Sequence, residues 1–475
     1  MSRSVTNIKQ ITFLLLALVG LTACVVSPPK KHPVMNIPVA FKESGAWKIA
    51  HPADHLPRGK WWELYHDSKL NALEEKVQVS NQSLLSSLAK AAQANALVRV
   101  ARAAYYPTLN GNGSASRASS GAGGASSSLS TTGVSTSSIA GTSETLSLGL
   151  SWNVDVWGST RHNVSATKAT AEATESDVQS VLLSLQTQLA QDYFTLRVVD
   201  AQRSLLDREI TEYKKSLELT QNRYKAGVAA RQDVAQAEAQ LAAARAAAID
   251  TGVQRAQMEH AIAVLVGLTP AALTIAPSSD NLRVPSMPSS APSQCLERRP
   301  DIAAAERRVA SANEQIGVAR AAFFPAVTLS ANGGFRGVID LLSKPNRYWS
   351  LGSAAAAPIF DAGLRKAQLD EVSAVYDQNV ADYRQTVLAG FQAVEDNLSA
   401  LRILAQETSA QDVAVRAARE SERVAIDEYK AGTQNYLNVI IAEATALTDE
   451  QNALAIIGKR LTASVQLIQA LGGGW

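Results

Sequence analysis

The amino-acid sequence contains two copies of one pattern. The motif Val100-Ala-Arg-Ala-Ala-Tyr-Tyr-Pro107 returns as Val318-Ala-Arg-Ala-Ala-Phe-Phe-Pro325, and Tyr224-Lys-Ala-Gly227 returns as Tyr429-Lys-Ala-Gly432. Self-similarity at such a long period indicates a duplicated structural unit, so any architecture has to be drawn for one half and then doubled. A duplicated unit without paired catalytic groups favours a scaffold or a channel over an enzyme.

The first residues are typical of an export signal. Arg3 and Lys9 precede an apolar run over residues 11–21, which is short for a membrane-spanning helix. The run ends in Leu21-Thr-Ala-Cys24, which resembles the lipobox of bacterial lipoproteins. The resemblance implies a signal peptide over residues 1–23, acyl chains on Cys24 that anchor the chain, and the outer membrane. An ordinary secretory signal with a chance cysteine is the alternative.

The composition excludes several classes of protein. The only cysteines are Cys24 and Cys295, so we expect no intramolecular disulfide once Cys24 is acylated. Arg3 and Lys9 account for the formal net charge of +2, and the balanced remainder argues against a nucleic-acid partner. No stretch after residue 24 is long and apolar enough for a membrane helix, so a membrane-spanning part must be made of strands.

Residues 24–60 are expected to form a lipid-anchored extended segment, because prolines recur along it. The only tight cluster of His and Asp side chains begins in this segment and ends at Asp67. We expect this cluster to be solvated rather than to bind a metal ion. Trp61 and Trp62 follow the segment, and we expect them to pack as anchors.

The periodicity of the first half changes twice. Apolar residues at helical spacing predict one helix from about residue 68 to 104, which Pro107 ends. Leu146 to Val154 then alternate with polar residues, which predicts a strand, and a weaker strand runs from 107 to about 117. The Ser- and Gly-rich tract between them, residues 118–143, is expected to be an exposed loop of the hairpin.

Helical periodicity then resumes from residue 158 to Tyr224. About 66 residues would make a rod of about 100 Å, which suggests coiled-coil packing. A return helix over about 231–266 completes a helical hairpin. The expected domains are a first repeat 61–285, with β-hairpin 107–155 and helical hairpin 158–267, and a second repeat 286–475, with β-hairpin 325–358 and helical hairpin 363–471.

Four such strands cannot close a barrel, because single-chain barrels begin at eight strands. An open apolar sheet would also leave unpaired edges in lipid. We therefore expect a barrel shared by several chains. Two chains would give eight strands filled by side chains, and three would give twelve with space inside. The helical rods would leave the barrel on one side, with the Ser-rich loop at the other end.

The order of elements resembles that of the TolC-like outer membrane efflux proteins, and more closely their lipoprotein branch. Besides the lipobox, the resemblance rests on motifs spread along nearly the whole mature chain, namely Trp61-Trp62, Ala103-Ala104-Tyr-Tyr-Pro107, Ser151-Trp-Asn-Val-Asp-Val-Trp-Gly158, Tyr224-Lys-Ala-Gly227 with Asp233, Leu296-Glu-Arg-Arg-Pro-Asp-Ile302, Pro358-Ile-Phe-Asp-Ala-Gly363 and Tyr429-Lys-Ala-Gly432. Any one of these motifs alone would be weak. Eight in the same order are a specific signal.

The resemblance implies a mainly α-helical fold with a membrane β-barrel: a homotrimer with twelve strands and a long helical tunnel across the periplasm. The function it implies is the outer membrane channel of a tripartite efflux pump, a passive duct for drugs or other small toxic compounds. The implied partners are outer membrane lipid, a periplasmic adaptor and an inner-membrane pump of the resistance–nodulation–division or the major-facilitator class.

The resemblance also assigns roles to the turns between the long helices. The tips that meet the adaptor would contain Tyr224, Gly227, Asp233, Tyr429 and Gly432, the glycines serving first as turn residues. The periplasmic gate would contain the residues that follow the second tip, which are Leu437, Asn438 and Ile441. The resemblance places a carboxylate at the position of Ile441, and some relatives have another where Asn438 stands. This chain has neither, so we expect a gate that closes largely by apolar contact. Simple core packing of Ile441 is the alternative.

Catalytic signals are absent from the sequence. It has no His-Glu-x-x-His, Gly-x-Ser-x-Gly or Cys-x-x-Cys motif and no phosphate-binding loop, so we expect neither an enzyme nor a cofactor. A lipid-anchored periplasmic adaptor or a structural coiled-coil protein is the alternative function. An adaptor would need compact β-rich domains around a single helical hairpin, whereas the strands here are isolated hairpins within a doubled unit. A secreted hydrolase would need a globular βαβ or all-β pattern and an active site, and the sequence shows neither.

Overall fold

The computed structural model describes residues 59–118, 141–278, 282–285, 298–337, 342 and 346–473. The signal peptide, Cys24, Cys295, the extended segment up to residue 58 and most of the Ser-rich tract lie outside the described residues. The chain forms two compact units. Among the described residues, the first unit holds Gln93–Ala171 and Arg307–Val380, and the second holds the remainder.

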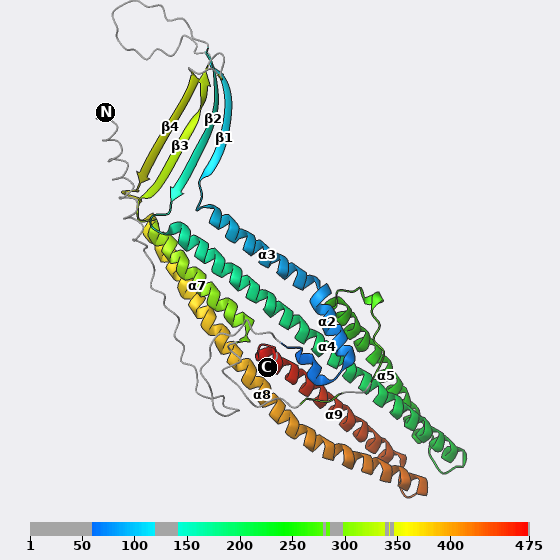
Figure 1. The fold of residues 1–475 in the computed structure, drawn as a ribbon. Helices are drawn as coiled ribbons and strands as arrows, with labels where there is room; N and C mark the ends of the chain where they lie inside the picture. Colours follow the sequence, from blue (N-terminus) through cyan, green and yellow to red (C-terminus); the bar gives the residue numbers. More distant parts are fainter. Residues whose placement is uncertain are drawn as a thin grey trace, which may run out of the picture. The chain divides into compact units, whose positions relative to one another are not determined.

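The first unit contains one antiparallel sheet of four strands in the order β1-β2-β3-β4 (Figure 1). The strands are β1 (Thr108–Ala118), β2 (Gly141–Val154), β3 (Ala326–Gly337) and β4 (Arg347–Ala356). They lie where the two-residue period predicts them, and the β2–β3 pair joins the two repeats. β2 begins earlier than expected, because its first residues pair with the end of β1 in spite of their Ser- and Gly-rich composition.

The strand register gives the sheet two different faces. Directly opposed residues of an antiparallel pair point to the same face, and Trp152 lies opposite Leu329 while Asn153 lies opposite Thr328. One face is therefore mostly apolar, with Leu109, Leu146, Leu148, Leu150, Trp152, Leu329, Phe335, Trp349 and Leu351. The other face is polar, with Asn110, Asn112, Ser147, Ser151, Asn153, Thr328, Ser330, Asn332 and Ser350.

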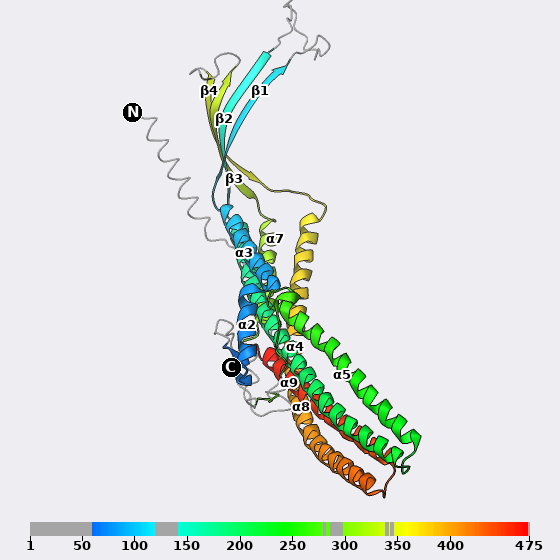
Figure 2. The same ribbon diagram turned by 90° about the vertical axis from the view of Figure 1, so that its right-hand side faces the viewer.

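Four long helices form two helical hairpins, α4 (Ser159–Lys225) with α5 (Arg231–Leu265) and α8 (Leu364–Ala431) with α9 (Tyr436–Ala470). In the second unit, α5 returns along α4 and α9 returns along α8 (Figure 2). A shorter helix, α7 (Pro300–Ala321), precedes β3, and a short turn of helix, η3 (Pro270–Ala272), follows α5. None of the described helices is long and apolar enough to cross a membrane.

The single helix expected before β1 is in fact two helices, α2 (Ser68–Ser80) and α3 (Gln82–Ala103). Asn81 separates them with an extended backbone. Its side-chain amide donates to the Leu265 carbonyl at the end of α5 (2.7 Å), and its side-chain oxygen accepts from the Leu84 N–H (3.0 Å). The apolar spacing continues through this break, so periodicity alone did not reveal it. Gly267 passes so close to the Ser80 carbonyl that a Cβ there would clash.

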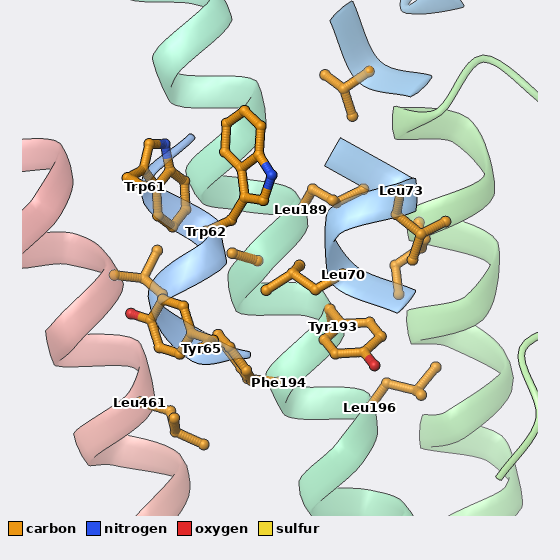
Figure 3. Close-up of a cluster of buried hydrophobic side chains, with 14 of the residues drawn as sticks. Trp61, Trp62, Tyr65, Leu70, Leu73, Leu189, Tyr193, Phe194, Leu196 and Leu461 are labelled. Carbon is orange, nitrogen blue, oxygen red and sulfur yellow. The ribbon is translucent and has the colours of Figure 1, made fainter. Parts of the chain in front are cut away.

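A hydrophobic core in the second unit fixes the N-terminal end of the described chain (Figure 3). The short helix η2 (Trp61–Tyr65) places both tryptophans in it, with 4% and 2% of their surface exposed, which confirms their predicted packing. Tyr65 packs against Phe194 of α4, and its hydroxyl lies 2.7 Å from Ser464 Oγ of α9. The side chains at the centre of this cluster therefore come from helices far apart in the sequence.

Asp67 corrects the expectation of a solvated His and Asp cluster. Its carboxylate accepts from the N–H groups of Lys69 and Leu70 and so caps α2. The Asp67 carboxylate also accepts from the Tyr193 hydroxyl at 2.7 Å, and Asp67 is buried. The histidines before residue 59 lie outside the described residues. Asp67 is a structural cap whose partner on α4 was not visible in the local sequence.

Glu74 of α2 is fully buried, and neither of its carboxyl oxygens has a hydrogen-bond partner in the described structure. Burial raises the pKa of this carboxyl well above its ordinary value, so it is held in the neutral form. An unsatisfied buried polar group costs stability, because it has given up its hydrogen bonds to water.

Replacing Glu74 with methionine is therefore expected to stabilise the protein. The expected gain is about 1–3 kcal/mol, the cost of an unsatisfied buried polar group. The measurement is thermal unfolding of the purified protein. The control is Glu75→Met, at the neighbouring exposed carboxylate that pairs with Lys60, which is expected to change stability by less than about 1 kcal/mol. Destabilisation by Glu74→Met alone would contradict the prediction.

Candidate functional site

The two turns between the long helices have the same backbone geometry. Gly227 and Gly432 both adopt positive φ, at 78° and 81°. Each glycine N–H donates to a carbonyl three residues back, and the N–H of the next residue donates to a carbonyl five residues back. This is the Schellman arrangement that ends helices at glycine, because side chains resist the left-handed conformation. The predicted backbone role of both glycines is confirmed.

The helices that follow the turns are capped by polar side chains. At the start of α5, Asp233 accepts from the Ala230 N–H at 3.2 Å. At the start of α9, Asn435 accepts from the Asn438 N–H at 3.2 Å. Both interactions satisfy N–H groups that a helix start leaves without partners. Asp233 thus has a capping role that accounts for its place in the turn motif.

The two motif tyrosines occupy different environments. Tyr224 is 45% exposed, whereas Tyr429 is only 4% exposed. The Tyr429 ring packs against Tyr436 of α9 at 5.2 Å between centroids, in a small core with Val439 and Ala442. The Tyr224 side chain is therefore available to a partner, and the Tyr429 side chain holds the second helical hairpin together.

Arg223 links the two turns. Its guanidinium lies over the Tyr429 ring, 4.6 Å from the centroid, and Nη1 donates to the Tyr429 carbonyl at 2.6 Å. This contact of Arg223 was not predicted from the sequence. A signal was nevertheless present, because Arg223 precedes the first Tyr-Lys-Ala-Gly motif where Glu428 precedes the second. The repeats thus differ in charge at a position where α4 contacts the end of α8.

Two of the three expected gate residues are exposed apolar side chains. Leu437 is 49% and Ile441 55% exposed, and they lie one turn apart on α9. Asn438 lies between them in sequence, and its side chain donates to the Gln434 side chain. Asn438 and Ile441 also line a groove of about 460 Å³ between α8 and α9. Within one chain, Ile441 is thus not a core residue, which was the alternative.

A buried carboxylate lies two residues beyond Ile441. Glu443 is 1% exposed, accepts from Ser216 Oγ at 2.7 Å and from the Gln240 amide at 3.1 Å, and so connects α9 with α4 and α5. Burial raises its pKa to about 7. Glu443 was not predicted from the sequence, because the spacing of residues along a helix does not show which other helices pack against it.

Further carboxylates surround this position. The pKa values of Glu209 of α4 and Glu422 of α8 are raised to about 7. Burial is the main cause, and the negative charge of a neighbouring carboxylate is the second. The carboxylate of Glu450 pairs instead with Arg419 and with Arg208. Glu212 adds a further negative charge close to Glu422 and Glu443. The helices α4, α8 and α9 therefore share a cluster of acidic groups, whose charges are only partly compensated.

Comparison with known proteins places this arrangement in a family. The family model described as outer membrane efflux protein matches residues 73–268 and 291–473. The chain belongs to this family. It is 30% identical to the probable efflux pump outer membrane protein TtgC of Pseudomonas putida over 96% of this chain and 93% of that protein. It is 28% identical to the cation efflux system protein CusC of Escherichia coli over 96% and 97%.

Solved structures show the same fold. The outer-membrane channel OprN is 27% identical, with a TM-score of 0.85 over 95% of this chain and 100% of that chain. The MtrE outer membrane channel of Neisseria gonorrhoeae, solved in its open state, is 26% identical, with a TM-score of 0.81 over 95% and 98%. The protein is therefore an efflux channel of the outer membrane, with a mainly helical fold and a small antiparallel sheet, and it is not an enzyme. The expected resemblance to this family is confirmed.

The buried carboxylates predict how stability depends on pH. The native state binds more protons than the unfolded state between the ordinary glutamate pKa of 4.5 and about 7. Stability should therefore fall as pH rises through this range. We expect a lower melting temperature at about pH 8 than at about pH 5, measured on the purified protein in detergent.

Glu443→Gln tests the contribution of one of these carboxylates. The amide can still accept from Ser216, and it carries no charge, so the variant should be about 1–3 kcal/mol more stable than wild type at pH 8. The difference should shrink at acidic pH. Glu238→Gln on α5, at a side chain that is 46% exposed, is the matched control and should change little. Equal effects of the two substitutions would contradict the assignment.

Proposed function

We propose that three copies of this chain close their sheets into a twelve-stranded barrel across the outer membrane. The two outer strands, β1 and β4, each pair on one side only within the described sheet. Unpaired backbone groups are not tolerated in lipid, so β1 of one copy would pair with β4 of the next. The apolar face would meet lipid, and the Asn- and Ser-rich face would line a water-filled lumen. Three copies provide space for that lumen, whereas two would give a barrel filled by side chains.

The duct is proposed to close at the helical turns. Three copies would arrange Leu437 and Ile441 as two apolar rings at one constriction, and an apolar constriction blocks ions by losing its water. The observation that carries this proposal is the exposure of both side chains, one turn apart, on a helix whose opposite face is buried. Asn438 would add a neutral ring where some relatives have a carboxylate.

The turns themselves are proposed to meet a periplasmic adaptor, which connects the channel to an inner-membrane pump. The contact surface would consist of the exposed Tyr224 side chain, the backbone at Gly227 and Gly432, and the capped helix start at Asp233. Tyr429 would support this surface from beneath, because its ring is buried. Acyl chains on Cys24 would add a lipid anchor.

The cargo is proposed to be drugs or other small toxic compounds. The relatives are named for different exports, including toluene, cations and pyoverdine, so the shared channel does not dictate the compound. Selectivity would then lie in the pump. Deleting the gene and measuring susceptibility to a drug panel identifies the cargo class, and unchanged susceptibility to every compound would argue against drug export.

Shortening the gate residues is expected to open the closed channel. Leu437→Ala and Ile441→Ala each widen the constriction and weaken its apolar contacts, so the conductance of the closed trimer in planar bilayers should rise several-fold. The double variant should exceed either single one. Closure should also respond only weakly to divalent or trivalent cations, because the proposed rings contain no carboxylate.

Val228→Ala provides the matched control for the gate experiment. This side chain is apolar and 65% exposed at the first turn, and it lies outside the proposed rings. Its truncation should leave closed-state conductance unchanged. If both gate variants also leave it unchanged, the apolar gate is excluded while the barrel proposal stands.

Cysteine cross-linking tests the shared barrel. Ser350→Cys on β4, combined in turn with Asn110→Cys, Asn112→Cys or Ser114→Cys on β1, places thiols on the polar face of neighbouring copies. At least one pair should give oxidised dimers and trimers in the outer membrane fraction. Each single variant should remain monomeric on a denaturing gel. A chain that stays monomeric with every pair, and is extracted from the inner membrane, would contradict the proposal.

A further inference from the structure

An apolar pocket lies at one end of the sheet in the first unit. Its volume is about 460 Å³, within the range of small-ligand sites. Most of its lining side chains are apolar or aromatic, and three are polar or charged. The lining residues are Tyr105, Trp152, Asn153, Val154, Asp155, Val156, Trp157, Arg161, Val327 and Leu329. All these residues belong to the same compact unit. These pocket residues are different from the candidate gate and tip residues at the turns between the long helices.

The pocket continues the apolar face of the sheet. Trp152 lies opposite Leu329 and Val154 opposite Val327, so these four side chains share that face. The indole N–H of Trp152 donates to the Tyr105 carbonyl at 3.0 Å. The indole N–H of Trp157 donates to the Pro325 carbonyl at 2.8 Å. Both indoles have satisfied their polar groups within the protein, so these two side chains offer aromatic surface to an occupant.

Two of the lining residues, Asp155 and Arg161, carry charged side chains. Asp155 accepts from the N–H groups of Thr160 and Arg161, which caps α4, and from the Arg161 guanidinium at 3.2 Å. Arg102 of α3 acts electrostatically on the Tyr105 hydroxyl together with these two groups. Two cations and one carboxylate leave a net positive charge beside an apolar cavity. This combination fits an amphiphile with an anionic head.

A strand from a second copy is a poor fit for this pocket. The pocket residues that lie in strands belong to β2 and β3, the two central strands. Each of these strands is already hydrogen-bonded to a neighbouring strand on both sides. Strand addition needs an open edge, and only β1 and β4 have one. Aromatic residues typically mark the level of lipid headgroups in outer membrane proteins, and Tyr105, Trp152 and Trp157 gather here.

We propose that this pocket binds one acyl chain of an anionic glycerophospholipid of the periplasmic leaflet, whose phosphate pairs with Arg102 and Arg161. The acyl chain would bury its methylenes against Trp152, Val327 and Leu329. The proposal depends on the outer membrane location of the protein, and it is independent of the gate and of the number of copies in the barrel.

Native mass spectrometry of the purified full-length protein in detergent tests the site. The protein is incubated with dioleoyl phosphatidylglycerol or dioleoyl phosphatidylcholine, and retained lipid is counted per chain. Wild type should retain phosphatidylglycerol in preference to phosphatidylcholine. Val327→Phe and Leu329→Phe fill the pocket and should each reduce retained phosphatidylglycerol about tenfold. Ala331→Phe, on the same apolar face but outside the pocket, should retain it as wild type does.

Charge variants test the headgroup. Arg102→Gln should reduce the preference for phosphatidylglycerol about fivefold, whereas Arg99→Gln, one turn earlier on α3, should preserve it. Equal retention by wild type and both filling variants would overturn the proposal, as would equal effects of the two arginine variants. Cys24→Ser distinguishes the chain's own acyl group. If added lipid binds only to that variant, the native occupant is the N-terminal anchor and the proposal is wrong.

Discussion

The pairing of β2 with β3 is the contact on which the membrane part of this protein depends. It joins the two halves of a duplicated chain into one sheet, whereas each half alone would provide only a two-stranded hairpin, which is marginally stable in isolation. The shared register also collects the apolar side chains on one face and the polar ones on the other. Because backbone groups must be paired in lipid, the two open edges of the described sheet support the proposal that several copies share one barrel.

Duplication supplied two similar helical hairpins, and side-chain differences made them unequal. Both turns end on a glycine in the left-handed conformation. Only the second turn is held by Arg223, whose cation lies on the Tyr429 ring. Only α9 exposes two apolar side chains, Leu437 and Ile441, directly after its turn. The duplicated sequence thus gives both turns the same backbone. The properties that distinguish one turn from the other come from the few positions at which the two repeats differ.

The candidate site was predictable from the sequence in its backbone and much less so in its side-chain surroundings. The glycine turns follow from local conformational preference, and resemblance to the family pointed to Leu437 and Ile441. The contacts of Arg223 and Glu443 were not predicted, because helical spacing assigns a residue to a face of its helix without identifying the helix that packs against that face. The acidic cluster around Glu443 exists only because α4, α8 and α9 bring together carboxylates from distant parts of the chain.

The sequence by itself determined the duplication, the order of helices and strands, the alternation along β2 and the glycine turns. These features depend on the conformational preferences of neighbouring residues, which a short stretch of sequence contains. Only the tertiary structure decided that Asn81 breaks a continuous helical pattern, that Asp67 is buried beneath Tyr193, and that Tyr429 is buried while Tyr224 is exposed. Each of these outcomes depends on a partner that lies far away along the chain. Periodicity and local propensity do not contain the identity of such partners.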